Sequence, residues 1–562
     1  MKKLFPGRLA GLVGGQLLWA FSTMAQVPVV PTPAWQTALS LGTPPRSGNG
    51  IGNVVPDSAG NVYLSGSFRG IARFGSIQLA GDTSLRYSNV DGFVAKWNPT
   101  SGFVWAVKIS GADLEGVAAL AVRGRSLYLA GSCTSPSVHF GPLTLTNSAP
   151  TPTRFNQTYV ARLTDLGTTA AWAWAQPVVG AIQVSDLAVS GSSLYLAGTC
   201  ANSTTFGALT FPTPVSGTVI AKLTDTGTSA SWGWSQLVAG SVRLANRDDT
   251  MYVAGTFFGP TISFGSTTLT NVGASNGSHD LYVAKLIDTG PAGTWEWAQR
   301  GGGPDREELR DVAVSGNKVY VTGIFYDPTI TFGSTTLTNA GVVDLFVARL
   351  TDTGQAGSWT WAQRAGGSTG PDHAVALAVR QSAVYVAGYF SGLTSTFGAT
   401  TLQNAATRDA DVFLAKLTDT GTAGTWAWAR SAGGTEWDVA TAVAVGPTGN
   451  VVLAGHFLSR PATFGPLSIW SHFGTDGYTS FLAVLNDPLP TLSESVSLSP
   501  NPARGSVQVA GSGPTATLLD GLGRPVRIVP LTDGAATLDL LGVRAGLYLV
   551  RAGSQTRRLV VE

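Results

Sequence analysis

The stretch FVARLTDTGQAGSWTWAQRAGG, residues 346–367, reads as a strand, a tight turn and a second strand. Close copies of it occur elsewhere in the chain: VARLTDLGTTAAWAWAQ, IAKLTDTGTSASWGWSQ, VAKLIDTGPAGTWEWAQ and LAKLTDTGTAGTWAWAR. In the turn, the side chain of Asp352 can cap the backbone and Gly354 can adopt a positive φ. We therefore interpret the repeated Asp and Gly as turn chemistry and not as catalytic groups.

Three anchors recur in register, about 65 residues apart. They are a strand ending in glycine (YVTG at 320–323), a Phe-Gly pair and the VAKL-like strand, and each occurs seven times. Each unit holds four alternating or apolar runs separated by turn residues, which is typical of antiparallel strands. In the unit that contains the opening stretch the four strands, A to D, start at Asp311, Val319, Asp344 and Ser358. The repeat predicts an all-β chain, with residues 33–486 forming a seven-bladed β-propeller.

The two ends of the repeat predict how the ring closes. After its C strand, FLAVL at 481–485, the seventh unit runs into NDPLPTL and has no Trp-x-Trp strand. A segment that resembles the missing strand, PAWQTALSLG at 33–42, precedes the first unit. We predict that this N-terminal segment completes the last blade and removes the exposed edges. A linear solenoid is the competing architecture, but it needs atypical capping repeats at its ends.

The Trp-x-Trp pair is expected to pack inside the protein. Residues two apart on a strand point to the same face, so Trp359 and Trp361 are predicted to lie side by side. Large flat side chains would fill the space between neighbouring blades and bury apolar area. The alternative is an exposed aromatic platform for sugars. We favour core packing, because a large apolar side chain at a repeated strand position is usually interior.

Composition narrows the function classes. Charged residues make up 12% of the chain and the net charge is +2, so nothing predicts a nucleic-acid or lipid-surface partner. Residues 1–25 read as a secretory signal peptide, with a basic start, an apolar run and cleavage after Ala25. A retained membrane anchor is the alternative. No later segment has the ~20 apolar residues that a membrane span requires, so the mature chain is predicted to lack one.

Residues 33–486 resemble the bacterial β-propeller repeat abbreviated SBBP. The resemblance is carried by Asp311–Phe325, Asp344–Leu350 and Gly366–Asp372, which match a DVAV-like strand, NVYVTG, D-x-FVAKL and a following Gly-Gly acidic stretch. The resemblance implies the propeller fold. It implies no particular activity, because such repeats are not tied to one function.

The C-terminal segment resembles a different family, the type A C-terminal sorting domain of type IX secretion. The matching motifs are SLSPNPARG (497–505), LLDGLGRPV (518–526) and GLYLVRAGSQTRRLVVE (546–562), while Arg557, Arg558 and Leu559 depart from the usual ending. The resemblance implies a small β-sandwich over 498–562, after a linker at 487–497. It also implies that the type IX machinery is a partner and that the protein is secreted or held on the outer-membrane cell surface.

A ligand site is expected on the face that carries the long loops between strands B and C and between strands D and A. The loops from D to the next A carry acids in four places, and these could gather at one mouth of the central channel. Such a cluster would bind a cation, with Ca²⁺ the cofactor considered, or an extracellular glycan or protein; the alternative is a solvated loop face. The candidate binding residues are Asp113, Glu115, Asp305, Glu307, Asp372, His373, Glu436, Trp437 and Asp438.

Catalytic signatures are weak, and no catalytic residue is predicted. The five histidines have no zinc-binding spacing, and no D-x-D-x-D-G calcium loop occurs. GASNG at 273–277 fits the letters of a nucleophile elbow but lies in a B–C loop. TDTGQAGSW resembles the Asp box of sialidases with too long an Asp-to-Trp interval. The sequence therefore favours a surface binding or adhesion protein; a glycosidase-like enzyme acting on polysaccharide and a structural surface-layer role are the alternatives.

Two cysteines, Cys133 and Cys200, occupy equivalent positions in adjacent units. An exported compartment permits a disulfide between them. Equivalent positions in neighbouring blades can exceed the ~7 Å Cα separation that a disulfide tolerates. Two buried thiols are the alternative, and the sequence leaves both open.

Overall fold

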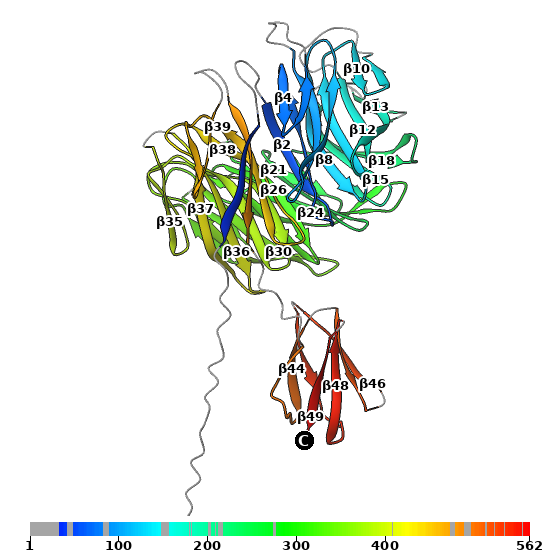
Figure 1. Cartoon of the computed structure of the whole chain (residues 1–562), viewed down its shortest axis with the longest axis vertical. Coiled ribbons are helices and arrows are strands. Elements are labelled where there is room, and N and C mark those ends of the chain that lie inside the picture. Colours follow the sequence, from blue (N-terminus) through cyan, green and yellow to red (C-terminus); the bar gives the residue numbers. More distant parts are fainter. Residues whose placement is uncertain are drawn as a thin grey trace, which may run out of the picture.

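The structure is a computed structural model. It describes residues 33–41, 49–81, 89–147, 157–178, 180, 182–200, 204–207, 209–211, 217–273, 277–326, 328–406, 409–471, 478–487, 496–511, 514–521, 523–532, 534–553 and 555–562. Within these ranges every regular element is a β-strand (Figure 1). It follows that no membrane-crossing helix occurs in the described ranges. The predicted signal peptide, most of the linker and part of GASNG lie outside them.

Seven successive antiparallel sheets make up the larger part of the molecule, and strands A, B, C and D of each are consecutive neighbours in hydrogen bonding. We call each sheet with its connections a unit and number the units along the chain. Unit 1 consists of β2 (Asn49–Pro56), β3 (Val62–Phe68), β6 (Asp91–Asn98) and β7 (Gly102–Ser110). Unit 2 consists of β8 (Glu115–Arg123), β9 (Ser126–Cys133), β12 (Gln157–Asp165) and β13 (Ala170–Val178). Unit 3 consists of β14 (Ile182–Ser190), β15 (Ser193–Cys200), β18 (Gly217–Asp225) and β19 (Ala230–Val238).

Units 4 to 6 repeat this order. Unit 4 consists of β20 (Val242–Arg247), β21 (Thr250–Phe257), β24 (Asp280–Asp288) and β25 (Gly293–Gly302). Unit 5 consists of β26 (Glu307–Ser315), β27 (Lys318–Phe325), β30 (Asp344–Asp352) and β31 (Gly357–Ala365). Unit 6 consists of β32 (Asp372–Arg380), β33 (Ala383–Phe390), β36 (Asp411–Asp419) and β37 (Gly424–Ala432).

Each B–C connection carries a short hairpin that contains the Phe-Gly pair. In chain order, the hairpins are β4 (Ile71–Phe74) with β5 (Ile77–Ala80), β10 (Ser137–Phe140) with β11 (Leu143–Thr146), β16 (Thr204–Phe206) with β17 (Leu209–Phe211), β22 (Thr261–Phe264) with β23 (Thr267–Thr270), β28 (Thr329–Phe332) with β29 (Thr335–Thr338), β34 (Thr394–Phe397) with β35 (Thr400–Gln403), and β40 (Ala462–Phe464) with β41 (Leu467–Ile469).

Unit 7 takes its fourth strand from the other end of the chain. Its own strands are β38 (Asp438–Val445), β39 (Asn450–Phe457) and β42 (Thr479–Asn486). The N-terminal β1 (Ala34–Leu41) pairs antiparallel with β42, with Trp35 opposite Leu485 and Leu39 opposite Leu482. In Figure 1 this dark-blue strand lies against the orange strands of unit 7. The predicted partnership between the N-terminal segment and the FLAVL strand is confirmed.

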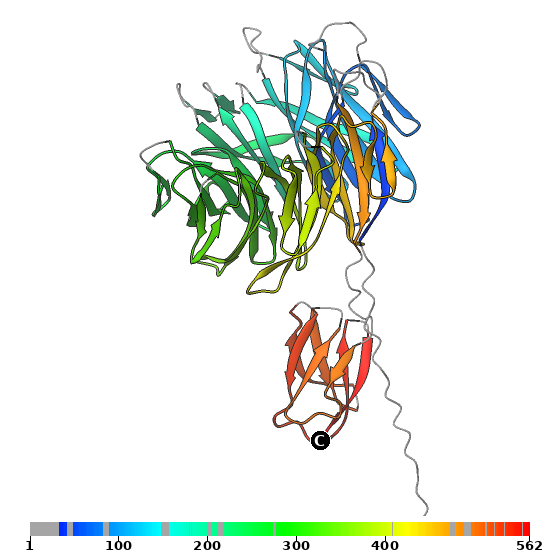
Figure 2. The ribbon, with the colours of Figure 1, turned by 90° about the vertical axis from the view of Figure 1, so that its left-hand side faces the viewer.

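The hydrophobic core lies between the sheets, as the alternation of apolar residues requires. Seven clusters of buried side chains each draw on two units, and successive units follow one another around the larger part of the molecule (Figure 2). One of these clusters joins Val452 and Leu482 of unit 7 to Leu64 and Ala95 of unit 1. We call the contact between two such units a joint. The architecture is all-β and propeller-like.

In units 2 to 6 the two tryptophans of the D strand point to opposite sides, so the prediction of a shared face is wrong. A β-bulge separates them: Trp361 lies opposite Arg349, while Trp359 lies opposite Leu350, and Thr360 is the extra residue. The extra residue shifts the alternation by one. Trp359 packs edge-on against Phe332 of its own hairpin at 4.9 Å, whereas Trp361 reaches unit 6. Trp361 is buried, as expected.

The repeated turn Asp links neighbouring units. Asp352 caps its own turn through the amide of Gly354 at 2.8 Å, and Gly354 has φ of 100°, so the turn interpretation is confirmed. The same carboxylate accepts hydrogen bonds from Tyr252 at 2.7 Å and Trp297 at 3.3 Å, both in unit 4. Lys285 of unit 4 lies 3.2 Å away. We call this group of Tyr, Lys or Arg, Trp and Asp the hub; the hub carboxylates are Asp165, Asp225, Asp288, Asp352, Asp419 and Asp487.

Both cysteines are free and buried, so the disulfide alternative is wrong. Each ends strand B of its unit, at the place where other units have a core Phe such as Phe325. Burial, together with the nearby charge of Glu115, raises the pKa of the Cys133 thiol to about 12. The thiols therefore act as small apolar core groups.

The C-terminal residues form two further sheets with a core of their own. The strands are β43 (Ser497–Ser499), β44 (Ser506–Ala510), β45 (Thr515–Leu519), β46 (Pro525–Pro530), β47 (Ala535–Asp539), β48 (Gly546–Ala552) and β49 (Gln555–Val561). Asn501 of the Pro-Asn-Pro motif accepts the amide of Val560 at 2.9 Å and donates to the carbonyl of Arg558 at 2.8 Å. In the middle motif, Asp520 accepts from the backbone and side chain of Arg524. Both motifs thus have roles in holding this unit together.

Candidate functional site

The predicted acids are distributed over four joints and do not form one cluster. Four of them are the first residues of A strands and are buried: Glu115, Glu307, Asp372 and Asp438. Their backbone amides donate to the previous unit, to the carbonyls of Val90, His279, Val343 and Ala410. Asp305 and Glu436 are exposed and Asp113 is half-buried. Among the described residues, no group of three or more His, Cys, Asp or Glu is arranged to hold a metal ion.

Each buried acid of an A strand lies beside the Asp that begins strand C of the preceding unit. The residue that precedes this Asp supplies the carbonyl just described, which fixes the two carboxylates next to each other. The pairs are Asp91 with Glu115, Asp280 with Glu307, Asp344 with Asp372, and Asp411 with Asp438. We call them the acid pairs.

Burial dominates the electrostatics of the acid pairs. It raises the pKa of Asp372, Asp411 and Asp438 to about 6, because the charged form loses its hydration. It raises the pKa of Glu115 to about 7, and the charges of Asp91 and Asp113 add to the effect. The carboxylates also anchor loops: Asp438 accepts the amides of Leu458 and Ser459 at 3.0 and 3.2 Å. These acids are therefore groups that hold the joints and not free carboxylates at a channel mouth.

A second feature combines aromatic rings and arginines across units 5 to 7. His373 and Tyr389 stack with ring centroids 4.8 Å apart and planes at 12°, and Trp437 follows at 5.8 Å from Tyr389. The ring of Trp437 is 36% exposed. We call this feature the aromatic strip; its members are Arg306, Glu308, Arg310, Tyr326, His373, Tyr389 and Trp437.

The arginines of the strip are held by one carboxylate. Glu308 pairs with Arg306 on one side and with Arg310 at 2.6 Å on the other. Arg306 also lies over the ring of Tyr326, 5.2 Å from its centroid. The side chains of Arg306 and Arg310 are 52% and 38% exposed. Their five N–H donors suit carboxylate or phosphate recognition.

The histidine of the strip is neutral at physiological pH. Burial, together with the nearby charge of Arg310, lowers the pKa of His373 to about 4, although the charge of Glu308 opposes the change. A neutral imidazole stacked on Tyr389 is a flat, weakly polar surface. Together with the Trp437 ring it can pack against a sugar face, while the arginines hold an anionic substituent.

Sequence reasoning found two members of the strip, His373 and Trp437, and missed the others. Tyr326 lies just after the last residue of strand B in unit 5, and Tyr389 lies just before the last residue of strand B in unit 6. The predicted site residues lie instead in or next to the D–A loops. The sequence does carry a signal for these residues: an aromatic residue at the end of strand B, in a unit whose strand A begins near a charged or aromatic residue. Strand pairing places Tyr389 opposite His373.

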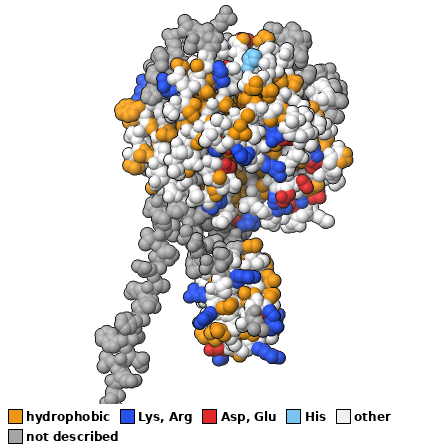
Figure 3. Space-filling model, turned by 45° about the vertical axis from the view of Figure 1, so that its right-hand side comes forward, with side chains coloured by type: hydrophobic (Ala, Val, Ile, Leu, Met, Phe, Trp, Pro, Cys, Tyr) orange, Lys and Arg blue, Asp and Glu red, His pale blue; other side chains and the backbone are white. Residues whose placement is uncertain are grey.

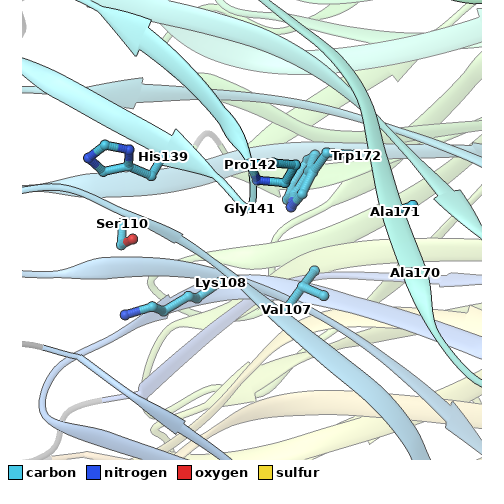
Figure 4. Close-up of a pocket in the computed structure, with 9 residues that line it drawn as sticks. All are labelled: Val107, Lys108, Ser110, His139, Gly141, Pro142, Ala170, Ala171 and Trp172. Atoms are coloured by element: carbon cyan, nitrogen blue, oxygen red, sulfur yellow. The ribbon is translucent and has the colours of Figure 1, made fainter.

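A shallow pocket of about 450 Å³ lies elsewhere, between the D strands of units 1 and 2 and a hairpin of unit 2. Figure 4 shows Lys108, Ser110 and His139 toward one side of it, and Val107, Pro142 and Trp172 toward the other. The imidazole of His139 hydrogen-bonds Thr144 at 3.1 Å, and Lys108 donates to the carbonyl of Ala80 at 2.9 Å. These polar groups already have partners in the protein, so the aromatic strip is the better candidate.

No family model matches the chain, and no curated protein matches its sequence. Among solved structures, the chain is similar to the phage phi92 endosialidase, at 12% identity and a TM-score of 0.35 over 93% of this chain and 87% of that one. It is similar to Drosophila Plexin A in complex with Semaphorin 1b, at 9% identity and 0.37 over 83% and 89%. It is also similar to Kuenenia stuttgartiensis hydrazine synthase, at 10% identity and 0.38 over 72% and 92%. TM-scores this low carry no inference about activity or ligand.

Proposed function

We propose that the seven sheets form a closed seven-bladed propeller that acts as an extracellular binding or adhesion module. Closure is supported by β1 as the fourth strand of unit 7 and by the cluster shared between units 7 and 1. The hydroxyl of Thr441 in unit 7 also donates to the carbonyl of Ile51 in unit 1 at 2.8 Å. A ring of this kind is a rigid base for a ligand site.

Coordinated replacements at the seventh joint support the same proposal. At the positions of the hub Tyr, Lys and Trp, unit 7 has Val452, Val484 and Thr37. At the position of the hub Asp, unit 1 has Asn98. All three donors and their acceptor are replaced together. This is expected if unit 7 faces unit 1, because a lone buried charge at that joint would be costly.

The location outside the cell is part of the proposal. It is supported by the signal-like residues 1–25 and by the three C-terminal motifs, whose resemblance implies export by the type IX machinery. The C-terminal unit has its own hydrophobic core, as an independent sorting module requires. Figure 3 shows scattered charged side chains of both signs on one face of the larger part of the molecule, and mostly Lys and Arg on the C-terminal unit.

The aromatic strip is the single observation that carries the binding function, and a saccharide is the ligand class that suits it. A stacked His373–Tyr389 pair and a part-exposed Trp437 offer flat faces, and Arg306 and Arg310 offer donors. Aromatic and Arg side chains are also those that most often dominate binding energy. Nothing in the described residues favours the glycosidase alternative, because the strip's carboxylate, Glu308, is occupied by two arginines.

A glycan array probed with the mature full-length protein tests this function. We expect binding that Trp437→Ala weakens by roughly 10-fold or more, the effect of losing a central aromatic contact. The matched control is Trp470→Ala, since Trp470 is 58% exposed and lies beyond the strip, after β41. Equal losses in the two variants, or no binding to any glycan, would refute the strip as a saccharide site.

A further inference from the structure

A groove lies at the joint of units 1 and 2, beside β7. Two hollows, of about 450 and 620 Å³, share Lys108, Ser110 and His139 in their walls and therefore adjoin. Lys108 and Ser110 are two apart on β7, and His139 of β10 pairs with Ser110, so the three side chains lie on one face. Pro142 and Trp172 lie toward the other side (Figure 4). The groove thus has a polar side and an apolar side.

Two residues of the groove replace smaller side chains of the repeat. Ser110 pairs with His139 where strand D of unit 1 meets the hairpin of unit 2. At three later joints the equivalent pair is Gly with Thr: Gly302 with Thr331, Gly366 with Thr396, and Gly433 with Thr463. Ser110 therefore adds a hydroxyl, and His139 puts an imidazole in place of a hydroxyl. Both changes add hydrogen-bonding groups to the same groove.

The indole N–H of Trp172 lacks a contact that its counterparts in units 5 and 6 make. These donate to a carbonyl of the preceding strand D: Trp359 to Arg300 at 2.8 Å and Trp426 to Arg364 at 3.0 Å. Lys108 has the position of those arginines, but within the described ranges Trp172 has no acceptor, and both residues line the smaller hollow. Units 3 and 4 also lack this bond, but their hairpins have Thr205 and Ser263 in place of His139.

The polar side chains of the groove have hydrogen-bonding groups to spare. Lys108 donates one of its three N–H groups to a backbone carbonyl at 2.9 Å, and Asp91, 4.0 Å away, balances its charge. His139 uses Nδ1 for its contact with Thr144. In the part of the chain that the structure describes, neither Nε2 of His139 nor the hydroxyl of Ser110 has a partner. A balanced charge with several free donors and acceptors suits a neutral ligand rich in hydroxyls.

We propose that this groove binds a neutral sugar unit and is a second saccharide site of the protein. Sugar hydroxyls both donate and accept, so they can bond the N–H of Trp172, the hydroxyl of Ser110 and Nε2 of His139. The C–H face of the sugar packs against the apolar side. The site has the ligand class of the proposed function but uses none of the residues of the aromatic strip. Two sites on one rigid body let a polysaccharide bind more tightly than either site alone.

Saturation-transfer NMR tests the groove, with glucose, galactose, mannose and N-acetylglucosamine as separate probes. The mature full-length protein carries Trp437→Ala, so the remaining signals do not come from the aromatic strip. We expect at least one sugar to bind with a Kd of roughly 1–10 mM, because a small polar ligand in a shallow groove gains little free energy per atom. His139→Thr installs the residue of later units, so it should fold and melt like its parent and weaken binding by roughly 5-fold. Trp172→Phe keeps the ring packing against Phe140 and should have a similar effect.

The matched control is Trp359→Phe. It removes the same N–H in unit 5, where Arg300 accepts it, and should leave sugar binding unchanged. Equal binding by His139→Thr and its parent, or no binding of any of the four sugars, would overturn the groove as a saccharide site. Neither result bears on the strip, which the glycan array tests with Trp437 intact. Failure of the array test, with sugar signals from the groove that His139→Thr weakens, would refute the strip and uphold the groove.

Discussion

Replacing one hub carboxylate should destabilise the protein through its buried neighbour. Asp165 accepts hydrogen bonds from Tyr63 at 2.8 Å, Lys96 at 2.7 Å and Trp105 at 3.0 Å, all across the joint of units 1 and 2. The Lys96 and Asp165 side chains are only 8% and 6% exposed. Asp165→Asn keeps the shape and some of the hydrogen bonds but leaves the Lys96 ammonium buried without a counter-charge.

The expected cost follows from that burial. Burial by itself raises the pKa of Asp165, but hydrogen bonds from Lys96, Gly167, Tyr63 and Trp105 outweigh it, and the net pKa is lowered. The carboxylate is therefore ionised at neutral pH, and its stabilising effect is lost only as pH falls below the ordinary Asp range of ~4. Breaking a buried pair by removing one partner costs about 3–5 kcal/mol. If the seven units, about 450 residues together, unfold as one body, this cost lowers the melting temperature by about 3–5 °C.

Calorimetry and guanidinium unfolding of three variants check this reasoning. The double variant Asp165→Asn with Lys96→Met removes the unpaired charge and should recover most of the loss, since an apolar replacement of a buried pair is nearly neutral. The control is Glu296→Gln, whose carboxylate is 40% exposed beside Lys285 and should cost less than about 1 kcal/mol. The reasoning fails if Asp165→Asn costs no more than Glu296→Gln, or if adding Lys96→Met deepens the loss.

Two further predictions concern pH and closure. Burial, together with the charges of Asp91 and Asp113, raises the pKa of Glu115 to about 7, so the folded protein favours the protonated form. Stability should therefore fall as pH rises from the ordinary Glu range of ~4.3 to about 7 and then level off. Glu115→Gln should flatten that fall in the denaturation midpoint, and an unchanged slope would contradict this prediction. Deleting residues 33–42 removes the strand that pairs with β42, so we expect calorimetry to show a broad, non-cooperative transition, and a melt like that of the intact protein would exclude the proposed ring.

The order of the strands could be predicted from the sequence because the repeat encodes it locally. Alternating apolar residues and Asp-Gly turns mark each strand, and a unit that lacks one strand indicates where a distant segment must pair. β1 therefore lies beside β42 as expected. The faces of the D strand could not be predicted in the same way. The bulge at Thr360 has no signature in the alternation of apolar and polar residues, so the sequence predicts Trp359 and Trp361 on one side of the sheet, whereas they lie on opposite sides.

The acids were harder to interpret, because exposure depends on which loop covers them. From sequence, Asp372 and Asp438 look like Glu436, a charged residue in a Gly-rich loop; only the structure buries the first two and leaves the third in solvent. The pairing of acids between units could have been found from sequence once the units were aligned, since an Asp at the start of strand C always accompanies an acid at the start of the next A strand. Such an alignment does not give the physical reason why the two acids occur together, which is the contact between adjacent units in the structure.

The hubs and the acid pairs both bury carboxylates at the joints, but they differ in how the charge is balanced. In the hubs of Asp165 and Asp288, one carboxylate meets one Lys and two neutral donors, so the charges balance and the pKa of the Asp is lowered. In an acid pair, two carboxylates meet at most one base, so the joint carries an excess negative charge and the pKa values rise. The hubs therefore stabilise the contact between units. The acid pairs are the part of the framework whose contribution to stability changes as pH rises from the ordinary carboxyl range toward about 7.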